Sequence, residues 1–172
     1  NGDKKPKTSK KKKKKKDQKE ERNLEFQFYF HDGIREKIIG NYMSAIALFK
    51  KCIELEPDED AAHFVLSELY ANVGQLQESF IHGEKAVELE SANRFYKLNF
   101  ALVALQVGKY KDAVKAYQDL LEEEPNNLQY LYQYSECLIY LNEVEDVLKV
   151  YNKIEELVGV YKELTLRKHE IY

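Results

Sequence analysis

The chain has 172 residues, 44% hydrophobic and 33% charged, which is enough for one domain with a buried core and a solvated surface. No apolar stretch approaches the roughly 18–20 residues that a membrane-spanning helix needs, and no signal peptide is visible. The net charge of −3 hides an asymmetry. Residues 1–22 hold 12 basic and 4 acidic side chains (+8), whereas the remainder holds 15 and 26 (−11).

The first segment, residues 1–22, is a lysine-rich tail with seven consecutive lysines at positions 10–16. It contains no Val, Ile, Leu or aromatic residue, so it cannot bury enough apolar area to offset the entropy lost on ordering. We therefore expect this tail to be disordered, with residues 17–22 as a solvated outward extension of the first helix.

From residue 23 the pattern becomes helical. Phe26, Phe30 and Ile34 recur at the spacing of one helix face, and a second helix follows Gly40. Pro57 ends this unit because its ring and missing N–H oppose continuation of a helix. Within residues 23–161 the pattern predicts four helix–turn–helix units, at 26–59, 60–93, 94–127 and 128–161. Residues 162–172 are predicted to be a capping helix or the start of a truncated fifth repeat.

The units repeat with a fixed period. Gly40, Gly74 and Gly108 lie 34 residues apart, and Asn142 takes the next equivalent position. A period of this length indicates one supersecondary unit repeated in tandem. Gly and Asn are also the residues that a left-handed turn at a helix end prefers. No sustained two-residue alternation appears, so we expect an all-α fold.

Small and large residues recur in the same register within the units. Leu66 and Ser67 of the second unit correspond to Phe100 and Ala101 of the third. The units resemble tetratricopeptide repeats, in which small residues lie where helices cross closely and large ones fill the layers between them. The resemblance implies an α–α superhelix, a right-handed solenoid of four repeats and a terminal helix. Departures from the motif are Asp32 and Glu36 in the first unit and Val147 and Ile154 in the fourth.

Gly83 stands where the repeat normally has an aromatic residue. A cavity left by one missing aromatic side chain would cost about 3 kcal/mol. We therefore expect Phe80 or Phe95 to move into this space.

In this family the first helix of each repeat lines a concave groove. The groove-facing positions here are mostly apolar or aromatic, and an exposed patch of this kind indicates a binding surface. The resemblance implies a protein–protein interaction scaffold, and we expect its ligand to be a partner protein or peptide with an apolar segment. The candidate contact residues are Phe30, Ile34, Phe64, Glu68, Phe95, Leu98, Leu102, Tyr132, Glu136 and Tyr140.

The best-known peptide-binding members of the family clamp a C-terminal carboxylate with Lys, Asn and Arg side chains at set groove positions. Among the corresponding positions of this chain, Asn99 alone matches. We therefore expect no carboxylate-clamp ligand.

Other functions stay open. The groove is already filled if the chain is the N-terminal part of a longer superhelix or forms a homo-oligomer. The lysines at 10–16 are either a solvated tail or a tether near a membrane, where each would contribute about 1 kcal/mol close to anionic lipid. Nucleic acid is disfavoured as a partner, because the tail has no aromatic residues for base stacking. A lysine-rich leader before such repeats resembles some bacterial envelope proteins, which favours the envelope or periplasm over the cytoplasm.

Nothing in the sequence indicates an enzyme. We assign the four histidines to different units. They form no HExxH motif and no pair at i, i+4. No glycine-rich phosphate loop occurs. Cys52 and Cys137 lack a CxxC or zinc-like spacing, and we expect both to be core residues. We predict no catalytic residue, no cofactor and no metal site.

Overall fold

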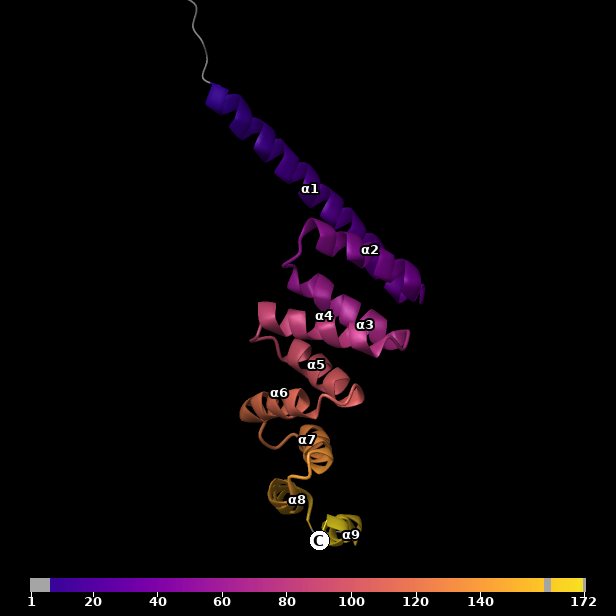
Figure 1. Ribbon diagram of the computed structural model, residues 1–172, viewed down its shortest axis with the longest axis vertical. Helices are drawn as coiled ribbons and strands as arrows, with labels where there is room; N and C mark the ends of the chain where they lie inside the picture. Colours follow the sequence, from indigo (N-terminus) through magenta and orange to yellow (C-terminus); the bar gives the residue numbers. More distant parts are fainter. Residues whose placement is uncertain (1–6, 160–161, 172) are drawn as a thin grey trace, which may run out of the picture.

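The computed structural model describes residues 7–159 and 162–171, and within them every regular element is an α-helix. The helices stack in chain order into an elongated superhelix, with α1 projecting from one end and α9 at the other (Figure 1). They are α1 (Lys7–Ile38), α2 (Tyr42–Leu55), α3 (Asp60–Asn72), α4 (Leu76–Leu89), α5 (Arg94–Gln106), α6 (Tyr110–Glu123), α7 (Leu128–Tyr140), α8 (Val144–Val158) and α9 (Lys162–Ile171).

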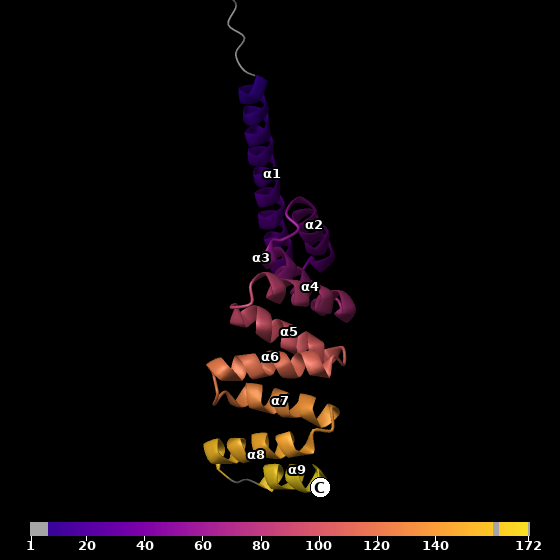
Figure 2. The same ribbon diagram turned by 60° about the vertical axis from the view of Figure 1, so that its left-hand side comes forward.

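Each helix packs mainly on the next one in the chain. In Figure 2, α4 to α9 lie one below another, and comparison with Figure 1 shows that the helix axes turn progressively along the stack. The first helices of the second and third units, α3 and α5, also touch. The predicted all-α superhelix is therefore confirmed.

The turns at the repeated position have the predicted left-handed backbone. Gly40, Gly74 and Gly108 have φ of +84°, +75° and +77°. Asn142 has φ of +60° and is the one non-glycine residue with positive φ in the described part of the chain. Asn tolerates this conformation better than most side chains, because it is short and polar. The 34-residue period thus places a reversal of the chain at each of these positions.

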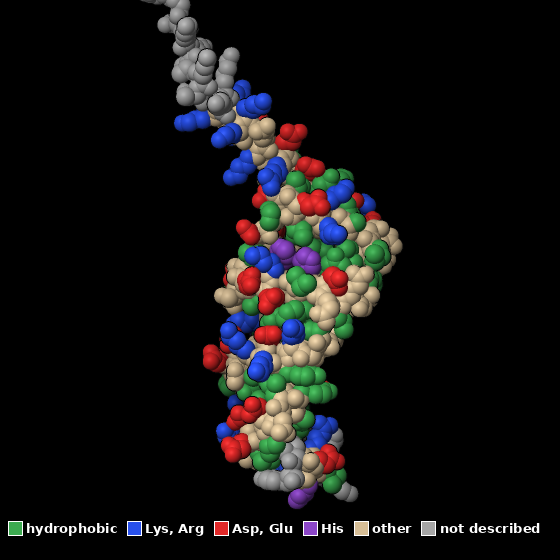
Figure 3. Space-filling view, in the orientation of Figure 1, with side chains coloured by type: hydrophobic (Ala, Val, Ile, Leu, Met, Phe, Trp, Pro, Cys, Tyr) green, Lys and Arg blue, Asp and Glu red, His purple; other side chains and the backbone are tan. Residues whose placement is uncertain are grey.

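The prediction of a disordered tail is wrong for residues 7–16, which belong to α1, whereas residues 17–22 extend that helix outward as expected; residues 1–6 lie outside the described residues. No proline or glycine interrupts the chain between Pro6 and Gly33, and lysine, glutamate and glutamine favour helix. An ion pair one turn apart, Lys16 to Glu20 at 3.7 Å, adds a little support. The tail therefore continues a helix that is already formed by packing from Phe26 onward. Figure 3 shows its basic side chains gathered on this projecting part.

The core runs through the stack as three clusters of buried side chains. Ala45, Ala101 and Ala113 lie at helix crossings and have no exposed surface. Val147 and Ile154, the larger residues of the fourth unit, are also buried and belong to the third cluster. No helix among the described residues is long and apolar enough to cross a membrane.

The expectation that Phe80 or Phe95 fills the space beside Gly83 is wrong. A Cβ added at Gly83 would lie 2.9 Å from Ser67 Oγ and 3.8 Å from the Cα of Phe100, so α4 approaches its neighbours too closely to leave room. The site is polar: Ser67 Oγ donates to the carbonyl of Ser79 at 2.8 Å and accepts from Asn99 Nδ2 at 2.7 Å. Close backbone approach and buried hydrogen bonds therefore replace the missing aromatic packing.

Candidate protein-binding surface

At the N-terminal end of the predicted groove, the aromatic candidates are half-buried and pack within or between repeats. Phe30 meets Phe49 edge-to-face at 5.2 Å between ring centroids, and Phe64 stacks on Tyr96 of the next unit at 4.6 Å. Ile34 packs against the same first core cluster. Phe30 packs within the first unit, whereas Phe64 joins the second unit to the third, and only part of each side chain is available to a ligand.

The charged candidate of the second unit already has an internal partner. Glu68 on α3 forms a partly buried ion pair with Lys37 at the end of α1. This contact joins the first and second repeats across the groove side. It also neutralises the carboxylate, which leaves this region of the surface mainly apolar.

The middle of the surface is more open. Phe95, at the start of α5, is 63% exposed, and the guanidinium of Arg94 lies 5.1 Å from the centre of its ring. Leu98 and Leu102 are half-buried on the same helix. Asn99 donates its amide hydrogen to Ser67, so the one residue that matches the carboxylate clamp is engaged inside the repeat stack.

A hollow of about 580 Å³ opens at the C-terminal end, between α7, α8 and α9. Two predicted contact residues line it, Tyr132 and Glu136. Tyr140 lies outside the hollow. Its exposed ring stacks on Tyr110, with 4.5 Å between the ring centroids. The hollow is lined by Tyr132, Gln133, Ser135, Glu136, Ile139, Tyr151 and Arg167.

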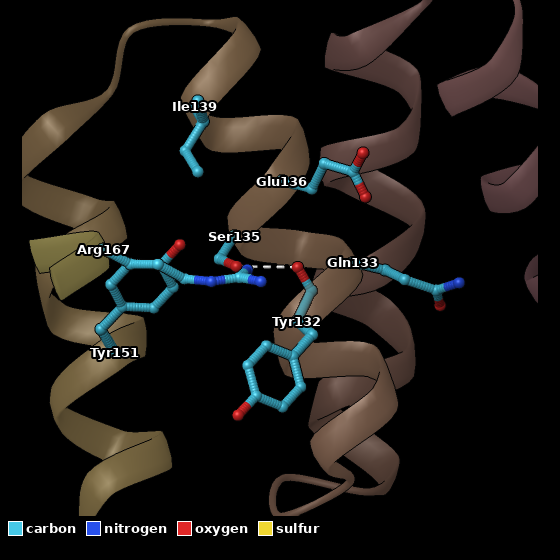
Figure 4. Close-up of a pocket in the computed structure, with 7 residues that line it drawn as sticks. All are labelled: Tyr132, Gln133, Ser135, Glu136, Ile139, Tyr151 and Arg167. Carbon is cyan, nitrogen blue, oxygen red and sulfur yellow. Dashed lines mark hydrogen bonds between the residues drawn. The ribbon is translucent and has the colours of Figure 1, made fainter. Parts of the chain in front are cut away.

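Figure 4 shows how these side chains are arranged. Ile139, Ser135 and Tyr132 project from α7 toward the side where Tyr151 and Arg167 lie, whereas the amide of Gln133 points the other way. Ser135 Oγ donates to the carbonyl of Tyr132 at 2.7 Å and so caps a backbone acceptor within α7. The lining of the hollow is therefore mixed, with one aliphatic side chain, two tyrosines, two neutral polar side chains, one acidic and one basic side chain.

The sequence-based list missed the other five residues of the hollow, which are Gln133, Ser135, Ile139, Tyr151 and Arg167. Tyr151 belongs to the second helix of its repeat, which is not expected to face the groove. Arg167 lies on α9, which Lys168 anchors to α8 by donating to Asn152 Oδ1 at 2.7 Å and by an ion pair with Glu155. Arg167 is 34 residues after Gln133, whose amide points away from the hollow, so the repeat register gives no signal for Arg167.

A pair of histidines joins the two helices of the second unit. The Nδ1 atoms of His63 on α3 and His82 on α4 lie 2.9 Å apart, and His63 Nε2 lies 2.9 Å from the carbonyl oxygen of Pro57. The ring of Tyr70 stacks on His82. Burial, helped by His63 and Lys50 and opposed by Glu78, lowers the pKa of His82 to about 4. His82 is therefore neutral near pH 7.

The interpretation that the histidines fall in different units is wrong, because His63 and His82 both lie within 60–93. Their separation of 19 residues is invisible to motif searches for nearby pairs. It becomes visible only when the first and second helices of one unit are laid side by side.

The two cysteines are core residues as predicted. Cys52 and Cys137 are fully buried, and burial is the main cause that raises the pKa of each thiol to about 11. Each thiol is thus protonated and unreactive near neutral pH. Within residues that the structure describes, no group of three or more His, Cys, Asp or Glu side chains is placed to hold a metal ion.

Two repeat-family models match the chain. A tetratricopeptide repeat model covers residues 37–59, and the model of the anaphase-promoting complex, cyclosome, subunit 3 covers residues 72–154. The TPR repeat-containing protein YvcD of Bacillus subtilis (strain 168) is 31% identical over 98 residues, which are 54% of this chain and 20% of that protein. The BBSome complex member BBS4 of Bos taurus is 24% identical over 107 residues, 62% of this chain and 20% of that protein. The match thus spans about one fifth of the length of either relative.

Solved structures share the fold. MamA from Desulfovibrio magneticus RS-1 superposes with a TM-score of 0.70 at 15% identity, over 86% of this chain and 83% of that one. YrrB, described as a TPR protein with an unusual peptide-binding site, gives 0.72 at 17% identity, over 84% and 74%. The 34-residue register, the stacked helix pairs and the two family matches agree, and this chain is a tetratricopeptide repeat protein.

Proposed function

We propose that this protein is an interaction scaffold that binds an apolar segment of a partner protein along the first helices of its repeats. The C-terminal hollow is the principal contact site, and Phe95 is a second one. The observation that carries the proposal is this hollow, because its walls combine an open volume with apolar side chains such as Ile139, which is 46% exposed. Apolar side chains that stay open to solvent on a groove are typical of a surface awaiting a partner.

The charged side chains of the hollow narrow the kind of partner segment that we expect to bind there. Glu136 and Arg167 line the same hollow, so a purely aliphatic ligand would leave two charged groups partly desolvated. We expect the bound segment to place an apolar side chain against Ile139 and Tyr132, with flanking polar groups near the two charges. YrrB, which shares the fold, is described as having a peptide-binding site, and this supports a peptide-like ligand.

A binding experiment on the full chain tests this proposal. A panel of immobilised peptides with apolar and aromatic segments is screened at pH 7.5, and affinities of the best peptides are then measured by fluorescence polarisation. Ile139→Ser and Phe95→Ser are expected to weaken binding at least tenfold, since each removes apolar contact area. The matched control is Ile81→Ser, because Ile81 is 60% exposed, at least as much as Ile139, but lies on α4, a second helix. Equal losses in all three variants, or no peptide bound better than millimolar, would contradict the proposal.

Self-association is a second candidate function, and the exposed outer face of α1 favours it. Leu24 and Phe28 are both largely exposed and lie one turn apart on the same side of that helix. An end face of this kind fits against another repeat or a second copy. Sedimentation equilibrium over a hundredfold range of concentration is expected to show association that Phe28→Ser abolishes. A strict monomer throughout that range would rule it out.

A further inference from the structure

The proton positions in the His63–His82 pair follow from one backbone carbonyl. The oxygen of Pro57 can only accept, so His63 Nε2 carries a hydrogen and donates to it. A neutral His63 then has a bare Nδ1, and this atom accepts from the Nδ1–H of His82 across 2.9 Å. The tautomers of both rings are thereby determined.

This arrangement limits how many protons the folded pair can hold. A first added proton enters at Nε2 of His82 and leaves the contact between the two Nδ1 atoms intact. A second one has only Nδ1 of His63 to occupy, where it would point at the N–H of His82. Two donors cannot face each other at 2.9 Å, so the rings must separate. In the unfolded chain, by contrast, two free histidines each take up a proton at pH values below about 6.5.

The surroundings offer little compensation for a charged pair. His63 is only 7% exposed, and the flat ring of Tyr70 covers His82. Lys50 on α2 repels a positive charge on His82, whereas Glu78 on α4 attracts one. The adjoining hollow of about 500 Å³ carries further charges on the α2–α3 connection and on α4, namely Asp58, Glu84, Lys85 and Glu88.

Those further charges are partly neutralised by one another. Lys85 Nζ lies 3.6 Å from a carboxylate oxygen of Glu88 and 4.0 Å from one of Asp58. The exposed carboxylates therefore do not serve as dedicated partners for an imidazolium. The second proton must then weaken the histidine contact rather than strengthen it.

We propose that the His63–His82 pair is an acid-sensitive latch, which holds α3, α4 and the α2–α3 connection together near neutral pH and releases them when both rings are protonated. Release changes the groove, because His63 is followed directly by Phe64, which stacks on Tyr96 of the third unit. Protonation thereby loosens the α3 section of the binding surface. This last consequence rests on the proposed function, whereas the latch itself does not.

Urea unfolding of the full chain at a series of pH values between 7.5 and 5 tests the latch. His82→Gln keeps an amide donor for His63 but cannot take up a proton. Acidification is expected to raise the unfolding equilibrium constant of both proteins. Below about pH 6, each further drop of one pH unit should raise the constant of the wild type about tenfold more than that of the variant. His31→Gln is the matched control, since His31 is exposed on α1 and should leave the pH dependence unchanged. Equal pH dependence of wild type and His82→Gln would overturn the latch.

A second measurement needs no variant. Nitrogen-15 NMR of the imidazole rings in the wild-type chain is expected to show the Nε2–H tautomer for His63 and the Nδ1–H tautomer for His82 at pH 7.5. The proposal would be overturned if the two rings titrated independently, each with a pKa near the ordinary value for histidine, and if either ring were the opposite tautomer at pH 7.5.

The effect on the groove is measured separately. An apolar peptide selected on the wild type should bind about twofold more weakly at pH 4 than at pH 7.5, since about half of the His82 rings are protonated at pH 4, and His82→Gln should reduce that difference. If no peptide binds, the proposed function fails while the unfolding series still decides the latch. If the peptide binds equally at both pH values, the regulation of the groove is refuted.

Discussion

Tyr117 and Tyr96 are two buried tyrosines whose hydroxyl groups meet different surroundings. The hydroxyl of Tyr117 has no hydrogen-bond partner within the described part of the chain, and burial raises its pKa. Tyr96 donates to Asp60 Oδ2 at 2.8 Å, and its pKa is raised by burial first and by this hydrogen bond second. An unpaired buried hydroxyl destabilises the folded state, whereas a paired one contributes modestly to it.

Replacement of each tyrosine by phenylalanine should therefore have opposite effects. Tyr117→Phe is expected to raise the free energy of unfolding by about 1 kcal/mol, and Tyr96→Phe to lower it by about 1 kcal/mol. Urea unfolding at pH 7 measures both changes, and each variant serves as the control for the other. A loss of stability in Tyr117→Phe as large as that in Tyr96→Phe would mean that the Tyr117 hydroxyl has a partner in solution.

Gly83 provides a second test at the residue scale. On an ordinary helix, alanine in place of glycine stabilises by about 1 kcal/mol. Here the added methyl group would press on Ser67 Oγ, which two hydrogen bonds hold in place. We expect Gly83→Ala to destabilise the protein by about 1–3 kcal/mol, as overpacking does. In a double-mutant cycle with Ser67→Ala most of that cost should disappear, and strict additivity would refute the steric explanation.

At the scale of elements, α1 behaves as two parts of one helix. From Phe26 onward it is packed against α2, whereas the described side chains from 12 to 25 are all exposed. The outer part is helical because its residues have good propensity and the packed part supplies the nucleus, which is the costly step in helix formation. Its lysines repel one another, so its stability is marginal.

Lys13→Pro is expected to unwind the outer part of α1 without affecting the repeats. Proline removes one helical hydrogen bond and clashes with the preceding turn. The far-UV circular dichroism signal should fall by the contribution of roughly ten residues, while the thermal midpoint changes by less than about 1 °C. An unchanged signal would show that residues 7–16 are not helical in solution, and a lower midpoint would show that they contact the body.

At the scale of the whole molecule, stability is distributed along a line. Each unit contacts mainly its neighbours, so interior units are supported from two sides and terminal ones from one. α3 is the helix most deeply inserted in the core, with buried residues from Ala62 to Tyr70. None of the described side chains of α9 is buried.

Native-state hydrogen exchange should reflect this gradient. Backbone amides of α9 and of the outer part of α1 are expected to exchange fastest, and those of α3 and α4 slowest. Mass spectrometry of the exchanged full chain, resolved by peptide, measures the order. Uniform protection from α2 to α9 would instead show that the stack unfolds as one cooperative unit.

The sequence predicted the surroundings of some groove residues better than those of others. Tyr132 and Glu136 were predicted as groove residues, and both line the C-terminal hollow. Phe64 and Glu68 were predicted in the same way, yet one stacks on Tyr96 and the other pairs with Lys37. Their role in binding stays a prediction. The register of a repeat assigns a side chain to a face, but its neighbours on the next repeat decide whether it is free.

The sequence by itself determined the all-α superhelix, the places where the chain reverses and the burial of both cysteines. These features depend on local chemistry, namely helical periodicity and the tolerance of Gly40, Gly74, Gly108 and Asn142 for positive φ. Only the tertiary structure decided what lies beside Gly83, that His63 and His82 lie in contact, and where a hollow opens between α7 and α9. Those features depend on distances between side chains of separate helices, and such distances are set by packing rather than by spacing along the chain.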